Sequence, residues 1–345
     1  MNKNQSHNSK LNERLKKRFT FMILFWIFVA VISVTLGRYA ISFEEFFQAI
    51  GQMFKGQSHL ADQNVVIVLK NIRIPRILLA SLVGFALSVA GATYQGVFQN
   101  AMASPDVLGA SSGAAFGAAL SILLHGNKFV IILFSFVFSL IAVFLSLLIS
   151  IKGHGDKVLL LVLSGMMVSS LFSAGTSYLK LVADPASELP AITYWLMGSL
   201  SGATKYDVMI AAIPMFIAII PIYLLRWQIN ILTLGDDSAR SLGIDPQRVR
   251  LIVIICSTLL TASAICVTGM IGWIGLVIPH LCRRIVGNNY MYLIPAASLV
   301  GASFLLIVDN ISRNLLMTEI PLGILTAFIG APFFMYLITM KKNIL

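Results

Sequence analysis

Long apolar segments recur from one end of this chain to the other, and most are long enough to cross a lipid bilayer. A helix rises about 1.5 Å per residue, so roughly 20 apolar residues span the hydrocarbon core. Composition agrees, because 58% of the residues are hydrophobic, 11% are charged and the mean hydropathy is +0.88. A soluble fold is excluded, and so is a soluble domain with a single anchor.

The sequence predicts an all-α polytopic membrane protein with about ten transmembrane helices. The expected spans are 19–36, two within 73–119, 129–151, 158–179, 208–225, 251–271, a short one ending near 284, 293–311 and 321–340. They form one transmembrane domain over residues 19–340. A basic lead over 1–18, expected to be disordered, precedes this domain, and a short tail over 341–345 follows it.

The run 73–119 is the most informative apolar stretch. It begins with Arg73-Ile-Pro-Arg76, continues as a spanning helix and, after Ser104-Pro-Asp106, re-enters as a run of Gly, Ala and Ser. Small residues let helix backbones approach closely where lipid cannot drive association. We therefore expect this helix pair inside the bundle.

Each half of the chain contains a Gly-rich helix that breaks near a proline. The first runs from Gly91 to Pro105 and the second from Gly269 to Pro279. Spans two to five are expected to begin on the outside, and spans seven to ten on the inside. We expect two inverted-repeat-like halves, an arrangement that many transporters share.

A short helix is expected after a breaker-rich loop. The loop, ADPASELP, covers residues 183–190, and the apolar stretch 192–200 is too brief to span. Irregular backbone at membrane depth is tolerated only where protein or a water-filled cavity covers it. We therefore expect this helix to lie beside a pathway.

The distribution of basic residues predicts the orientation. The segments expected on the cytoplasmic side carry 16 of the 25 Lys and Arg, so both termini are expected in the cytoplasm. Arg73, Arg76 and Arg313 fall on the outer side near helix ends, against this bias, and require another explanation.

Catalytic and metal-binding patterns are not evident. The sequence has no phosphate-binding loop and no hydrolytic set of Ser, His and Asp, and we expect no metal site. Cys256, Cys266 and Cys282 are interpreted as packing residues. Asp309 is the main candidate for proton coupling within a span, but Arg313 four residues later favours an ion pair on the helix surface.

A short helix is also predicted within the polar connector 226–250. Its small and apolar residues Leu234, Ser238, Ala239, Leu242 and Gly243 recur at spacings of three and four. Gly243 would end this helix, and Asp245-Pro246 would begin the next one. Ala and Gly favour close contact with another protein over a membrane surface. This pattern predicts a docking helix for a cytoplasmic partner.

Several motifs, in order over residues 60–340, carry a family resemblance. They are Arg73-Ile-Pro-Arg76, Gly91-Ala-Thr-Tyr-Gln95, Ser104-Pro-Asp-Val-Leu-Gly109, Leu234 to Gly243, Gly272-Trp-Ile-Gly-Leu-Val-Ile-Pro-His280, Glu319-Ile-Pro-Leu-Gly323 and Gly330-Ala-Pro332. With them the chain resembles permease subunits of bacterial ABC importers for ferric siderophores, haem and cobalamin, the FecCD type.

The resemblance implies a multi-pass protein of the bacterial cell membrane that works with other subunits. These are a second permease, identical or a sister chain, two cytoplasmic ATPases and an external substrate-binding protein. It implies that Arg73, Arg76 and Arg313 dock the binding protein. The positions matching the ATPase-coupling helix are Leu234, Gly235, Asp236, Ala239, Arg240, Leu242 and Gly243.

The resulting expectation is a transport subunit that is not itself an enzyme and carries a ferric siderophore inward. No cofactor is expected on this chain, since ATP and Mg would bind to the partner ATPase. Two alternatives remain at this stage: import of haem or cobalamin by the same kind of permease, and a proton-coupled secondary transporter that uses Asp309.

Overall fold

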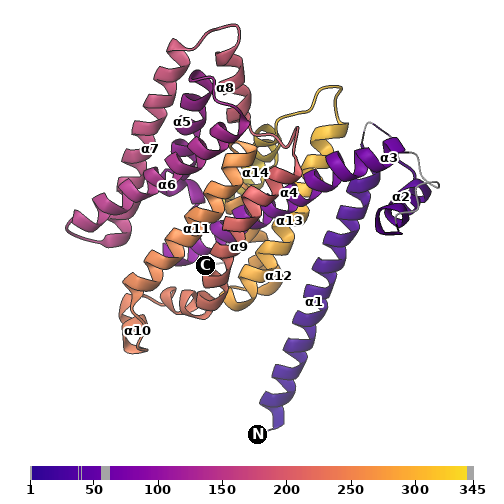
Figure 1. Ribbon diagram of the computed structural model, residues 1–345. Helices are drawn as coiled ribbons and strands as arrows, with labels where there is room; N and C mark the ends of the chain where they lie inside the picture. The colour runs from indigo at the N-terminus through magenta and orange to yellow at the C-terminus, as the bar shows by residue number, and fades with distance from the viewer. Residues whose placement is uncertain (1, 38, 40, 56–62, 340–345) are drawn as a thin grey trace.

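The computed structural model describes residues 2–37, 39, 41–55 and 63–339, and every regular element within them is helical (Figure 1). The helices are α1 (Asn2–Thr35), α2 (Phe43–Lys55), α3 (Gln63–Val68), η1 (Leu69–Arg73), α4 (Ile74–Val97), η2 (Pro105–Leu108), α5 (Ala110–Leu123), α6 (Lys128–Lys152), α7 (Lys157–Val182), α8 (Glu188–Met197), α9 (Lys205–Leu232), α10 (Asp236–Ser241), α11 (Pro246–Thr268), α12 (Ile274–Val286), α13 (Tyr290–Asn314) and α14 (Leu322–Thr339).

The predicted all-α membrane fold is confirmed. Within the described residues, 7 helices are long and apolar enough to cross a membrane, and α5 and α14 are shorter apolar helices. With α12 added, they correspond to the ten segments expected from the sequence. α10 and the start of α1 lie at the lower end of the bundle in Figure 1, whereas α3 and α8 lie at the upper end.

Helices extend beyond their predicted ends where neither Gly nor Pro stops them. α1 begins at Asn2, so the lead expected to be disordered is helical. The exposed pair Glu13 and Lys17, one helical turn apart at 2.8 Å, is compatible with this. α9 continues to Leu232, so residues 226–232 of the predicted connector belong to a helix.

The helix around Arg73 also begins earlier than predicted. α3, η1 and α4 follow one another without a break from Gln63 to Val97. Pro75 lacks the N–H that an α-helical turn would use, and the preceding turn, η1, is a π-helix. Arg73 and Arg76 therefore lie inside a long helix and not at its first turn.

α4 is the centre of the bundle and contacts α9, α11, α12 and α13. Glycines permit this: a Cβ on Gly84 would lie 2.2 Å from the Gly301 carbonyl oxygen, and one on Gly91 would lie 1.9 Å from that of Gly275. α5, the other helix of the predicted pair, contacts α6, α7, α8 and α11. The prediction that this helix pair lies inside the bundle is confirmed. Hydroxyl pairs then fix α4 against α11, with Thr93 Oγ1 2.6 Å from Ser257 Oγ.

Candidate functional site

The N-terminal end of α4 and the C-terminal end of α13 share a buried cluster of charged side chains. The sequence predicts that this end faces outward, and it is called the outer end below. Arg76 lies between two acids: its Nη2 donates to Asp309 Oδ1 at 2.8 Å and its Nη1 to Glu319 Oε1 at 2.9 Å. Arg313 Nε lies 3.2 Å from Asp309 Oδ2. Asp309 is fully buried and Arg76 is 6% exposed. Burial is tolerated because each charge has an opposite partner.

Arg73 lies beside this cluster and holds the end of α1. Its guanidinium donates to the backbone carbonyls of Val34, Thr35 and Tyr39, and it is 4% exposed. Its role in this conformation is to pair with carbonyls of the last turn of α1, which lack partners within the helix, and with one carbonyl of the segment that follows α1.

The three arginines predicted to dock a binding protein are thus gathered at one end but face the protein interior. The pairing of Asp309 with Arg313 is as predicted, although the pair is buried rather than on a helix surface. Since Asp309 is neutralised by two arginines, it gives no support to a proton-driven carrier. Sequence reasoning missed Glu319, whose only signal was its place in the Glu-Ile-Pro motif.

A hollow of about 680 Å³ lies between α8, α14 and the segment that joins α11 to α12. Its lining is apolar and includes Met197, Met270, Trp273, Phe328 and Met335. None of the described residues that line it carries a charge. The short helix expected beside a pathway, now α8, lies at this hollow.

Glycines let the three walls of the hollow approach one another. A Cβ on Gly269 would lie 2.1 Å from the Trp195 carbonyl oxygen, and one on Gly330 would lie 2.6 Å from Trp273 Cβ. Trp273 has a left-handed backbone with φ of 69°, which is unusual for an aromatic residue. Its ring packs edge-on against Phe334 of α14. Such strain at a wall is typical of functional segments.

Asp184 fixes the loop that precedes α8. The Ser187 hydroxyl and the Ala186 and Ser187 N–H groups donate to the Asp184 carboxylate, and these hydrogen bonds lower its pKa. The Asp184 N–H in turn donates to Glu188 at 2.9 Å. The reciprocal bonds fix the entry of the chain into α8.

At the opposite end of the molecule, α10 is a separate short helix. The sequence predicts that this end faces the cytoplasm, and it is called the inner end below. Gly235, with φ of 104°, precedes it, and Gly243, with φ of 77°, follows it. Ile244 N–H donates to the Ala239 carbonyl at 3.0 Å, closing the last turn around a left-handed glycine. Asp245 then caps α11, which confirms the predicted start at Asp245-Pro246.

The sequence predicts that Leu234, Ala239 and Leu242 share one apolar face, but the structure separates them. Ala239 is buried against the bundle, whereas Leu234 is 68% and Leu242 57% exposed. Asp236 accepts from the buried Arg250 at 2.9 Å, and Arg240 lies 3.4 Å from Asp237 on the exposed side. The six-residue helix is thus bonded on one side, and the two leucines that flank it, Leu234 and Leu242, are exposed.

Comparisons with known proteins identify the family of this chain. The family model of the FecCD transport family matches residues 24–340. The chain belongs to the FecCD transport family. This permease is 37% identical to the molybdate import system permease protein MolB of Haemophilus influenzae, over 93% of this chain and 95% of that one.

Other relatives cover almost the full permease as well. The Fe(3+)-citrate import system permease protein YfmE of Bacillus subtilis is 37% identical over 92% of this chain and 93% of that one. The hemin transport system permease protein HmuU of Yersinia pestis is 33% identical over 96% of this chain and 99% of that one.

A solved structure agrees in fold. It is of a transporter described as of the metal-chelate ABC type in an inward-facing conformation, with a TM-score of 0.85, 35% identity, and coverage of 94% of this chain and 99% of that chain. The protein is therefore an ABC importer permease of the metal-chelate kind, a multi-span membrane protein, and such permeases are not enzymes.

Proposed function

We propose that this FecCD permease conducts a ferric siderophore inward, driven by ATP hydrolysis on separate subunits. The observation that carries the choice of cargo is the uncharged lining of the hollow between α8 and α14. A small oxyanion would need fixed donors or cations along its path. A bulky organic chelate that shields its metal can instead pass weakly binding apolar walls of Met, Trp and Phe.

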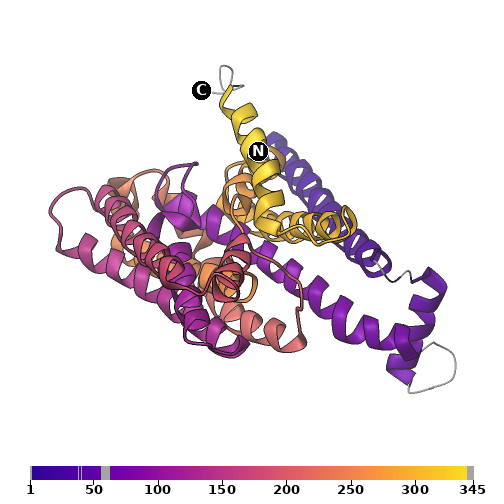
Figure 2. The same cartoon turned by 90° about the horizontal axis from the view of Figure 1, so that it is seen from above.

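The partner subunits are proposed from the surfaces that the chain leaves uncovered. α14 projects from the body of the bundle (Figure 2), and Phe328 on it is 75% exposed. A second permease, identical or a sister chain, would close the hollow there. The exposed leucines that flank α10 would contact a cytoplasmic ATPase, and both termini would lie in the cytoplasm.

The arginine cluster is proposed to act at the external binding protein. Arg73, Arg76 and Arg313 fix the ends of α1, α4 and α13, and Glu319 ties the segment before α14 to Arg76. An acidic lobe that docks here would compete with Glu319 for Arg76. The docking signal would then reach α14, a wall of the hollow, through an exchange of salt-bridge partners.

Transport assays on a deletion strain test the proposal. Cells would receive iron-59 as ferric siderophores, ferric citrate or haem, and separately labelled cobalamin or molybdate. We expect the loss of uptake of a ferric siderophore, and this uptake in wild type should survive collapse of the proton gradient while ATP is maintained. Loss of molybdate uptake alone would refute the proposed cargo, and uptake that stops with the gradient would refute the energy source.

A further inference from the structure

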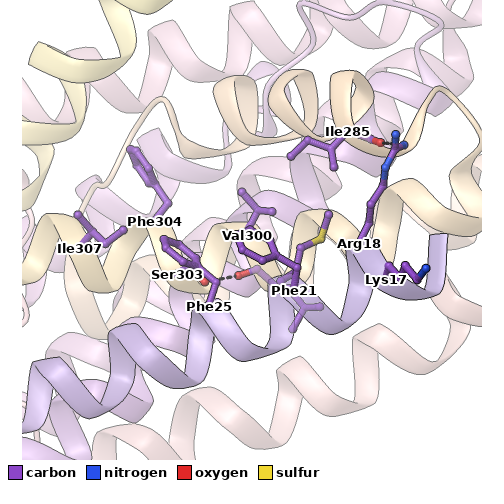
Figure 3. A pocket seen from close by; sticks show the side chains of 11 residues that line it. Lys17, Arg18, Phe21, Phe25, Ile285, Val300, Ser303, Phe304 and Ile307 are labelled. Carbon is purple, nitrogen blue, oxygen red and sulfur yellow. Dashed lines mark hydrogen bonds between the residues drawn. The ribbon is translucent and has the colours of Figure 1, made fainter. Parts of the chain in front are cut away.

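A second feature of the molecule lies on the flank formed by α1, α12 and α13, and it shares no lining residue with the hollow. There a groove of about 630 Å³ opens between the helices (Figure 3). Its walls are aromatic and aliphatic, and include Phe21, Phe25, Val300, Phe304 and Ile307. At one end the lining changes abruptly to Lys17 and Arg18.

The groove lies along the lipid-facing part of the chain. From Lys17 to Phe25, α1 advances eight residues, about 12 Å. Phe21 is 70% exposed and Leu24 and Phe28 are each 59% exposed, so this face of α1 is open to the membrane. An occupant of the groove must therefore be apolar over most of its length.

The basic end of the groove is ordered by contacts on two helices. Arg18 folds back and donates to the Ile285 carbonyl of α12, so its guanidinium is held at the mouth of the groove, as Figure 3 shows. Arg14 and Lys16 on α1 and Arg284 on α12 add positive charge nearby in the chain. Glu13, paired with Lys17, is the acid on this part of α1.

We propose that this groove binds one anionic glycerophospholipid, with an acyl chain along Phe21, Phe25 and Phe304 and its phosphate at Lys17 and Arg18. Basic pockets between transmembrane helices are suited to anionic lipid headgroups. The orientation of α1 explains why basic residues flank it, but it does not require two of them to line a groove. The bound lipid would fill the space between α1 and α13.

Another groove at the same end of the molecule mixes basic and acidic residues. It lies between α6, α7 and α11, and its lining includes Lys157, Arg248 and Arg250 together with Asp245. Arg250 is already paired with Asp236 at 2.9 Å. No acidic residue is among the described residues that line the groove on α1, so it is the better match for an anionic headgroup. The proposal does not depend on which substrate the permease carries.

Native mass spectrometry of the full-length permease with added phosphatidylglycerol or phosphatidylcholine tests the proposal. Phosphatidylglycerol should remain bound at one molecule per chain and at least tenfold better than phosphatidylcholine. Lys17→Gln with Arg18→Gln should weaken its binding roughly thirtyfold, since each basic residue near the surface contributes roughly a factor of five. Arg14→Gln with Lys16→Gln removes the same charge from the same helix but lies outside the groove, and should retain the lipid.

A third variant separates the groove from its charges. Val300→Trp fills the groove while it leaves Lys17 and Arg18 in place, and it should reduce retention of both lipids in protein that elutes as a single folded species. If the two charge variants lost phosphatidylglycerol binding equally, the lipid would be held by the overall positive charge of α1 and not by the groove, and the proposal would be overturned. Unchanged binding in Val300→Trp, or capture of a partner protein by a photo-crosslinker at position 300 in place of lipid, would also overturn it.

Discussion

The outer and inner ends of this permease are stabilised in opposite ways. At the outer end, Arg76, Asp309 and Arg313 are buried together and every charge has a partner. At the inner end, α10 is attached through Ala239 and the Asp236 to Arg250 pair, and its other side is exposed. Breaking a buried pair costs about 3–5 kcal/mol, whereas an exposed pair contributes about 0–1 kcal/mol.

This difference indicates how each end responds to a partner. The outer cluster can change state only by exchanging one charged partner for another, because an unpaired buried charge is too costly. The inner helix can change what it contacts while the rest of the fold stays intact. The predictions below test this contrast, in decreasing order of their expected effect on fold stability.

Arg76→Leu should have the largest effect. It leaves Asp309 and Glu319 near each other with too few cations, and we expect a loss of about 3–5 kcal/mol in the free energy of unfolding. Thermal unfolding followed by size-exclusion chromatography measures it. Arg76→Leu with Glu319→Leu retains the Asp309 to Arg313 pair and should recover much of the loss. Normal stability with abolished uptake would instead assign Arg76 to docking alone.

Glu319→Gln should have an intermediate effect, about 1–3 kcal/mol, because it weakens a charge-assisted hydrogen bond to Arg76 that is partly exposed. It should also free the segment before α14. Maleimide labelling of Ala327→Cys, in the wall of the hollow, should become faster in this background. Glu44→Gln, on the exposed surface of α2, is the control. Unchanged labelling would argue against a link from the outer cluster to α14.

Gly243→Val should cost the fold only about 1–2 kcal/mol, since its φ of 77° is strained for valine but no atom lies within 4 Å of the new Cβ. Uptake and co-purification of the ATPase should nevertheless fail. Gly155→Val is the matched control, because Gly155 also has a positive φ and open space around it, in the loop before α7. If both variants transport normally, α10 is not the coupling element.

Much of the fold could be predicted because hydropathy and breakers act locally. The apolar segments, the short α8 and the start of α11 at Asp245-Pro246 all follow from residues close in the chain. The partnership of Arg76 with Glu319 could not, since 243 positions separate them and only the packing of α4 against α13 brings them together. The burial of the arginines was missed for the same reason.

The exposed leucines that flank α10 provide the most selective test of the inner end. Periodicity placed Leu234, Ala239 and Leu242 on one face, but a six-residue helix anchored by Ala239 leaves both leucines outside. Leu234→Ser with Leu242→Ser should therefore change the free energy of unfolding by about 0.5 kcal/mol or less. Its affinity for the ATPase should fall at least tenfold, because apolar anchors in an interface are lost. The control is Leu181→Ser, which changes an 80% exposed leucine at the C-terminal end of α7. It should leave the affinity for the ATPase unchanged. Equal affinities for wild type and the double variant, measured by titration of purified ATPase in detergent, would mean that these leucines face something other than the ATPase.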